Sequence, residues 1–394
     1  MSLVTKLRNS AVYIVLAVEL LALIVFTIGW DSLDFAVYMW GGHAIAEDAR
    51  LYTEQALAHW FTYTPFAAVV FAPWAVLPTV VARVVWQLAS VAAFAGACAV
   101  TLRLAGRPVT RRTLAAVVAA GLALEPVYHT LFQGQVNLFL LALVLADVWL
   151  VSRGRCGGIG IGIAAAIKLT PAIFVVFFLM AGRTKAALTA AMTFGLCGLL
   201  GYLVAPDASR MYWLHLFFDT SRVGAPYISN QSPYGALRRL FTNDPAIDSW
   251  YLLVPLLIGV VGLVAAAILA RHGDWLAAVA ATGTTGLLVS PISWAHHWVW
   301  IVPALAVLLR GGRGGRIAAF GGYALFVLAP MWWTPHFGGP AEYGWHGWVT
   351  VVANCFLLAG LAFLGYVVRL AYVARRVVTA EVAPVRQEDA VLTG

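Results

Sequence analysis

Charged residues are scarce in this sequence. Asp, Glu, Lys and Arg account for 11% of the 394 residues, whereas hydrophobic residues account for 62%. An ordinary globular domain has about a quarter of its residues charged, so this chain cannot supply the polar surface of a soluble fold. A lipid bilayer accepts an apolar exterior instead. We therefore interpret the chain as a polytopic membrane protein.

Cysteine is also scarce, and none of the four residues (Cys98, Cys156, Cys197 and Cys355) stands in a Cys-x-x-Cys spacing. The spacing suggests neither a disulfide framework nor a cysteine metal site. The net charge of +8 comes from short basic clusters at the ends of apolar segments. That distribution suits membrane topology and anionic lipid headgroups rather than nucleic acid. We expect no nucleic-acid partner, no metal and no cofactor.

Apolar runs of helical length are frequent, and they predict an all-α fold with about twelve transmembrane or partly spanning helices. The first run is too long for a removed signal peptide and lacks a small-residue cleavage site. The predicted segments are 11–29, 80–102, 113–131, 136–152, 157–167, 171–181, 186–205, 251–270, 275–292, 295–310, 317–333 and 346–368. We expect residues 1–378 to form one integral-membrane domain and residues 379–394 a disordered cytoplasmic tail.

Basic clusters alternate with the loops that carry other polar residues, and 18 of the 25 Lys and Arg residues fall on one side of the predicted membrane. The positive-inside rule makes that side cytoplasmic. The clusters are Lys6/Arg8, Arg103/Arg107/Arg111/Arg112, Arg153/Arg155, Arg183/Lys185, Arg271, Arg310/Arg313/Arg316 and Arg369/Arg375/Arg376/Arg386. We therefore expect a multi-pass plasma-membrane protein with both termini in the cytoplasm.

Lys168 occupies an unusual position. It is one of three lysines, and it is the only charged residue between Arg155 and Arg183. Because both arginines favour the cytoplasmic side, the chain between them must cross outward and return. Pro171 follows closely and interrupts helix, so we expect Lys168 at the tip of a short helical hairpin. A cation there suits a phosphate oxygen, although a snorkelling anchor is the alternative.

Other candidate residues fall on the same outer side. Asp34 follows the first span and is open to three interpretations: a general base, a metal ligand together with Asp31, or a solvated loop residue. His296 and His297 are adjacent, so their side chains point about 100° apart on a helix and only one of them is expected to face a cavity. Zinc ligands on one helix face would instead stand at i and i+4.

Amide and basic side chains complete the candidate set. Gln133, Gln135 and Asn137 form a polar patch that either lines a water-filled pocket or joins helices. Cations on the outer side are unexpected and indicate either an anionic ligand or pairing with nearby acids. Further candidates on this side are Tyr63, Arg222, Asn230, Arg238, Arg239 and Glu342.

Taken in order, these motifs resemble the actinobacterial polyprenol-phosphate-mannose-dependent α-mannosyltransferases, integral-membrane enzymes of the GT-C type. The resemblance covers about residues 30 to 350. It is carried by Leu33-Asp34-Phe35-Ala36-Val37-Tyr38, Phe61-Thr62-Tyr63-Thr64-Pro65-Phe66, Gln133-Gly134-Gln135-Val136-Asn137-Leu138, Ala165-Ala166-Ile167-Lys168-Leu169-Thr170-Pro171, Asn230-Gln231-Ser232 and Ser290-Pro291-Ile292-Ser293-Trp294-Ala295-His296-His297. The sequence departs from the pattern at Ala295, where that family usually has an acidic residue, which puts a His–Asp relay there in doubt.

The resemblance implies an extracytoplasmic active site that transfers mannose from polyprenyl-phosphate-mannose to a mannosylated lipid or glycan. The reaction would invert the donor's configuration and form an α-(1→2) linkage, without a cofactor. The implied roles are catalysis by Asp34, His296 and His297, donor-phosphate binding by Lys168, Arg222 and Arg239, and substrate binding by Tyr63, Gln133, Gln135, Asn137, Asn230 and Glu342.

Two alternatives remain open at the level of sequence. A transporter or flippase of a lipid-linked sugar would share the lipid groove and the cations, but it would not need a carboxylate placed at the sugar. A transferase that uses another polyprenyl-phosphate sugar, such as arabinose or glucose, would share every motif. The sequence does not identify the acceptor.

Overall fold

The computed structural model describes residues 3–217, 219–336 and 340–382. In the first half the elements are α1 (Leu3–Gly29), α2 (Leu33–Ala44), η1 (Ile45–Tyr52), β1 (Gln55–Ala56), β2 (His59–Trp60), α3 (Pro65–Ala75), α4 (Thr79–Leu104), α5 (Arg111–Leu122), α6 (Glu125–Gln133), α7 (Asn137–Ser152), α8 (Ile159–Ile167), η2 (Thr170–Ala172), α9 (Ile173–Met180) and α10 (Thr184–Val204).

The second half continues in the same helical style. Its elements are α11 (Pro206–Met211), η3 (Tyr212–Leu216), α12 (Pro233–Leu240), η4 (Pro245–Ser249), α13 (Leu253–Arg271), α14 (Trp275–Val289), η5 (Ala295–Trp300), α15 (Ile301–Arg310), α16 (Arg313–Leu328), η6 (Pro330–Trp333), α17 (Pro340–Tyr343), α18 (Trp348–Ala353) and α19 (Cys355–Val382). Within the described residues the only sheet is the antiparallel β1–β2 hairpin, so the predicted helical class is confirmed.

Five of the described helices are long and apolar enough to cross a membrane. They are Ser10–Gly29, Thr79–Leu104, Thr184–Val204, Leu253–Arg271 and Cys355–Arg376. The multi-pass membrane class is therefore confirmed, whereas the count of twelve spans is not. Most of the other predicted segments correspond to apolar helices of 10–17 residues. At about 1.5 Å per residue these helices are shorter than the roughly 30 Å hydrocarbon core.

The predicted span 113–131 is not one straight helix. Its two parts, α5 and α6, meet at an angle of 76° and together make a sixth candidate span. Pro126 stands in the first turn of α6, and Leu124 before it has extended backbone angles. Because proline has no N–H to donate to the preceding turn, the α5 helix cannot continue through this position. The bend brings Glu125 and His129 into the interior of the protein.

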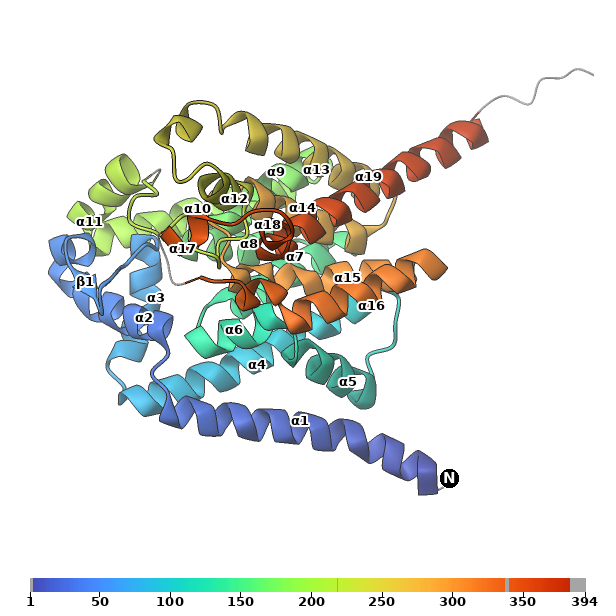
Figure 1. Ribbon diagram of the computed structural model, residues 1–394, viewed down its shortest axis with the longest axis horizontal. Coiled ribbons are helices and arrows are strands. Elements are labelled where there is room, and N and C mark those ends of the chain that lie inside the picture. The colour runs from blue at the N-terminus through green and yellow to red at the C-terminus, as the bar shows by residue number, and fades with distance from the viewer. Residues whose placement is uncertain (1–2, 218, 337–339, 383–394) are drawn as a thin grey trace, which may run out of the picture.

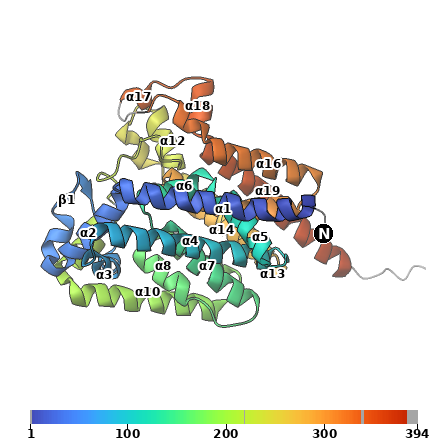
Figure 2. The same ribbon diagram turned by 90° about the horizontal axis from the view of Figure 1, so that it is seen from below.

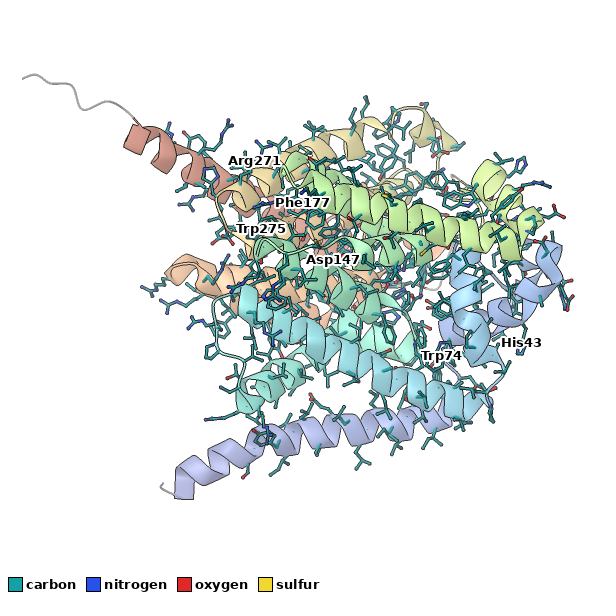
Figure 3. All side chains as sticks on the ribbon, turned by 180° about the vertical axis from the view of Figure 1, so that it is seen from behind. His43, Trp74, Asp147, Phe177, Arg271 and Trp275 are labelled. Atoms are coloured by element: carbon teal, nitrogen blue, oxygen red, sulfur yellow. The ribbon has the colours of Figure 1, made fainter. Side chains whose placement is uncertain are left out.

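The long helices run roughly along one direction (Figures 1 and 2). The beginning of α1 and the end of α19 lie at the same end of the molecule, while α2, β1, α11, α12 and α17 lie toward the opposite end. Figure 3 shows Arg271 and Trp275 near the end with the chain termini and His43 at the other. Helix α19 continues through Val382, and the rest of the tail expected from residue 379, residues 383–394, lies outside the described residues.

The predicted hairpin around Lys168 is present. Helix α8 ends at Ile167, and the next residue, Lys168, has extended angles (φ −143°, ψ 126°) before η2 and α9 begin. Gly158, just before α8, packs against Ala186 of α10, and α9 ends immediately before α10 begins. Both arms therefore meet the same end of α10. Asp147 of α7, labelled in Figure 3, holds the base of the hairpin. Its Oδ2 accepts a hydrogen bond from the Ile161 N–H at 2.7 Å.

Candidate active site

Lys168 is the centre of a polar cluster at the tip of the hairpin. Its Nζ donates to Asn137 Oδ1 at 3.1 Å and lies 2.7 Å from His297 Nε2. It also lies 5.5 Å from the centre of the Tyr63 ring, within the range of a cation–π contact. Burial lowers the pKa of Lys168 to about 7, and the charge of Asp34 opposes that shift. Lys168 is half-buried, and an anion beside its amine would favour the charged form.

Asp34 lies in the first turn of α2 and is partly buried. Burial raises the pKa of its carboxyl group, while a hydrogen bond with Gln135 and the charges of Lys168, His129 and His59 lower it. The hydroxyls of Tyr38 and Tyr63 lie 2.8 and 2.9 Å from Gln135 Oε1. This arrangement fixes the amide beside the carboxylate and gives Asp34 the properties of a proton acceptor.

The two adjacent histidines point in different directions, as helical geometry requires. His297 contacts Lys168, whereas the His296 ring lies edge-on to the ring of His129 at 5.0 Å. The His296 carbonyl accepts hydrogen bonds from Thr130 Oγ1 and Asn137 Nδ2, both at 2.9 Å. Asn137 therefore positions Lys168 and the histidine pair together. Within the described residues neither ring nitrogen of His296 has a hydrogen-bond partner.

Hydrogen bonds between distant segments hold these groups in place. The Thr64 hydroxyl donates to the Ala166 carbonyl and accepts from the Ala67 N–H, so it ties the start of α3 to the end of α8. Trp86 Nε1 donates to the Gly134 carbonyl at 2.8 Å and fixes the turn that carries Gln135. The site therefore depends on contacts between segments that are 48 and 102 residues apart in the sequence.

A small cavity of about 40 Å³ adjoins Lys168 and His297. A larger cavity of about 290 Å³ lies between α14, α15, α16 and α19, and its walls are almost entirely apolar. The two cavities share Leu287 and Trp300 in their walls. A cavity that has Lys168, Asn137 and His297 among its lining residues thus borders an apolar one, which is the arrangement that a ligand with a charged head and a hydrocarbon tail requires.

Four residues predicted at the site have other contacts in the structure. Asn230 donates to the Ala225 and Pro291 carbonyls and accepts from the Ser293 N–H. Arg239 is 3% exposed, and it donates to the carbonyls of Pro226, Tyr227 and Asn230 and to Asn354. Glu342 accepts from the Ile228 N–H, and Arg222 donates to the Tyr52 carbonyl and stacks over Trp60. These contacts organise the outer loops and do not bring the four residues to Lys168.

The sequence shows Glu125 and His129 just before the amide patch but gives them no role, and the structure places both beside the site. Glu125 Oε1 lies 2.8 Å from His129 Nδ1, and the Trp332 indole donates to the same oxygen at 2.9 Å. Gln133, which was predicted, lies 3.4 Å from His129 Nε2. The spacing of Glu125 and His129 at i and i+4 was the available signal, since it places both on one helix face.

Carboxylates near the site do not form a metal-binding group. Asp31, three residues before Asp34, forms an ion pair with Arg83 of α4. Across residues 3–217, 219–336 and 340–382, no three His, Cys, Asp or Glu side chains are arranged to hold a metal ion.

Comparison with known proteins extends over nearly the whole chain. The profile of glycosyltransferase family 87 matches residues 61–291. The chain is 34% identical over 373 residues to the polyprenol-phosphate-mannose-dependent alpha-(1-2)-phosphatidylinositol pentamannoside mannosyltransferase of Mycolicibacterium smegmatis, covering 88% of this chain and 90% of that protein. It is 32% identical over 375 residues to the polyprenol-phosphate-mannose-dependent alpha-(1-2)-phosphatidylinositol mannoside mannosyltransferase of Mycobacterium tuberculosis, covering 90% and 87% respectively. No solved structure matches the chain.

Proposed function

Because the chain belongs to glycosyltransferase family 87, we propose that it transfers mannose from polyprenyl-phosphate-mannose to a mannosylated phosphatidylinositol and forms an α-(1→2) linkage. The curated relatives support the donor, the acceptor class and the linkage. The observation that carries the proposal is the half-buried Lys168 amine, which contacts Asn137 and His297 at the tip of the hairpin.

Lys168 and His297 bind the phosphate of the donor. The phosphodiester is an anion, and Lys168 offers a cation in a site from which water is largely excluded, where charge stabilisation is strong. As the bond between the anomeric carbon and the phosphate oxygen breaks, the electron pair stays on that oxygen. Lys168 then stabilises the polyprenyl phosphate that leaves, and the leaving group carries its charge without a metal ion.

The apolar cavity beside the phosphate site holds part of the prenyl chain. Leu287 and Trp300 belong to both cavities, so a lipid whose phosphate lies at Lys168 continues directly between α14, α15, α16 and α19. Because the prenyl chain comes from the bilayer and not from water, close packing of its carbons against these walls stabilises binding. The tail therefore anchors the donor, and the polar end fixes the position of its sugar.

Asp34 acts as the general base. Its carboxylate accepts the proton of an acceptor hydroxyl while the hydroxyl oxygen attacks the anomeric carbon from the side opposite the phosphate. This geometry inverts the configuration at that carbon. The pKa of Asp34, raised by burial, makes the carboxylate a stronger proton acceptor than an exposed aspartate. The Gln135 amide holds it in position.

The active site opens on the extracytoplasmic side. Contacts among the loops support this placement: Arg271 donates to the Met180 carbonyl and Arg310 pairs with Asp274, so the basic loops gather together. The beginning of α1 and the end of α19 lie at the same end (Figure 1). The positive-inside rule assigns that end to the cytoplasm.

The transporter that remained open from the sequence has no specific support in the structure. A transporter built from repeats has corresponding broken helices in two related halves. The Lys168 hairpin carries the candidate chemistry in one half, and the relatives named above are transferases.

Transfer of mannose by purified protein tests the proposal. Polyprenyl-phosphate-mannose and a phosphatidylinositol mannoside are supplied to the wild type, to Asp34→Asn and to Asp207→Asn, whose side chain is exposed on α11. Loss of a general base lowers kcat by about 10²- to 10⁴-fold, so Asp34→Asn should lose transfer while Asp207→Asn keeps it. Equal activity of the two variants would remove Asp34 from the mechanism, and a wild type inactive with every mannosylated acceptor would overturn the proposed reaction.

A further inference from the structure

A second polar cluster lies next to the phosphate site, at the bend between α5 and α6. Glu125 is 1% exposed, and one of its oxygens accepts from both the His129 imidazole and the Trp332 indole. Its other oxygen, Oε2, has no hydrogen-bond partner among the described residues. One carboxylate therefore holds an imidazole and an indole at fixed positions and has an acceptor atom to spare.

His296 supplies two more polar atoms without partners. Its side chain is 6% exposed, and no described group hydrogen-bonds either ring nitrogen. Buried polar atoms without partners each cost about 1–3 kcal/mol and are rare in native proteins. Three such atoms in one cluster, two on His296 and one on Glu125, indicate that the cluster is completed by a polar ligand.

The cluster is buried on one side and accessible on the other. Glu125 and His296 form its buried side, while His129, with 14% of its side chain exposed, and the half-buried Gln133 and Trp332 form its accessible side. A carboxylate, imidazoles, an amide and an indole face are the groups with which proteins hold a sugar, because hydroxyls need both donors and acceptors and the ring needs an apolar surface.

The second cluster is separate from the phosphate site, and the histidine pair connects the two. His297 contacts Lys168 on one side and the His296 ring on the other, at 4.7 Å. The His296 ring in turn contacts His129. Asp34 hydrogen-bonds Gln135, whose partner Tyr63 has its ring centre 5.5 Å from Lys168 Nζ, and both Lys168 and His129 act electrostatically on the Asp34 carboxylate. The donor phosphate and the second cluster therefore flank the proposed base.

We propose that Glu125, His129, His296 and Trp332 form the subsite that binds the terminal mannose of the acceptor. The inference rests on the proposed function, since it assumes a donor phosphate at Lys168. Glu125 Oε2 accepts a hydrogen bond from one sugar hydroxyl, His129 and His296 bind its neighbours, and the Trp332 indole covers the ring. A hydroxyl of the bound mannose then reaches Asp34, which removes its proton during attack on the donor.

Steady-state kinetics with each substrate varied separately tests the subsite. The probes are a short synthetic α-mannoside acceptor and polyprenyl-phosphate-mannose. Trp332→Leu and Glu125→Gln should each raise KM for the mannoside about tenfold, as expected for the loss of a sugar contact, and change KM for the donor less than about twofold. Trp333→Leu is the matched control, because Trp333 is the next residue and 69% exposed.

The possible outcomes distinguish a failure of the subsite proposal from a failure of the proposed function. If the wild type transfers mannose and both variants keep its acceptor KM, the subsite is wrong and the transferase stands. If both KM values rise together and the melting temperature falls, the cluster is structural and the inference is overturned. If no mannosylated acceptor is used by the wild type, the proposed function fails before the subsite is at issue.

Discussion

The protonation state of Lys168 should make donor use depend on pH. Burial lowers the pKa of this lysine to about 7, from 10.5 for an exposed lysine. Only the ammonium form binds the donor phosphate strongly, and at higher pH a growing fraction of Lys168 is neutral. Above about pH 7, kcat/KM for the donor should therefore fall about tenfold for each pH unit, which makes the value at pH 9 about 100-fold lower than the maximum.

Replacement of Lys168 by arginine tests whether Lys168 causes the fall of kcat/KM above about pH 7. Arginine stays charged throughout the range, so Lys168→Arg should lose the alkaline fall even if its maximal rate is lower. Lys168→Gln, which has no charge at any pH, should reduce kcat/KM about 10²- to 10³-fold at the optimum. The groups that face Lys168 are Asp34, His297 and Tyr63. Of these, Asp34 governs the opposite, acidic limb, because a general base must be deprotonated.

The assay is initial-rate transfer of labelled mannose at low donor concentration between pH 5 and pH 9, with stability checked at each pH. An alkaline limb of the same position and slope in Lys168→Arg would assign the titration to another group. A wild-type profile that stays flat up to pH 9 would show that the ammonium charge is not needed for donor use. Either result refutes the role given to Lys168.

Two further predictions concern the residues that hold the site together. Asn230 is fully buried with its amide bonded to two carbonyls and two N–H groups, so Asn230→Ala should lower the free energy of unfolding by about 3 kcal/mol, measured by denaturation in detergent. Gly134 has φ +69°, and an added Cβ would lie 2.6 Å from the Cβ of Phe35, next to Asp34. Gly134→Ala should therefore reduce transfer at least tenfold. Gly182→Ala is the control, since Gly182 has φ +75° but open space around it. If Gly182→Ala loses as much activity as Gly134→Ala, backbone strain alone explains the loss.

The positions of the helices follow closely from the sequence, because apolar runs and basic clusters respond to the same bilayer. Segments 80–102 and 186–205 differ by only a few residues from α4 and α10. The hairpin at Lys168 was also predictable, from two arginines that favour one side and a proline between them. The bend at Leu124 was not predictable. A proline within a long apolar run can either bend a helix gently or end it, and the sequence does not show which of these Pro126 does.

Side-chain roles were harder to predict than backbone positions. Two adjacent histidines indicate that one faces a cavity, but only the three-dimensional packing shows that His297, and not His296, contacts Lys168. Arg239 shows a different limit. An outer arginine suggests an anionic ligand, yet its planar guanidinium carries five N–H donors, and here backbone carbonyls and Asn354 accept from it. The sequence does not show whether a bound ligand or backbone carbonyls accept the hydrogen bonds of such an arginine.

At position 295, where the family pattern usually has an acidic residue, this chain has alanine, and a carboxylate from another helix lies near the histidine pair. Ala295 is fully buried and its N–H donates to Ser229 Oγ at 3.2 Å, so a carboxylate there would need a partner that this packing does not offer. The carboxylate close to the histidines comes instead from α6, where Glu125 binds His129 and His129 contacts the His296 ring. A carboxylate–imidazole pair therefore stands beside the histidine pair although the motif itself contains no acid. Its position on a different helix from the histidine pair is what makes it available to orient an acceptor sugar toward Asp34.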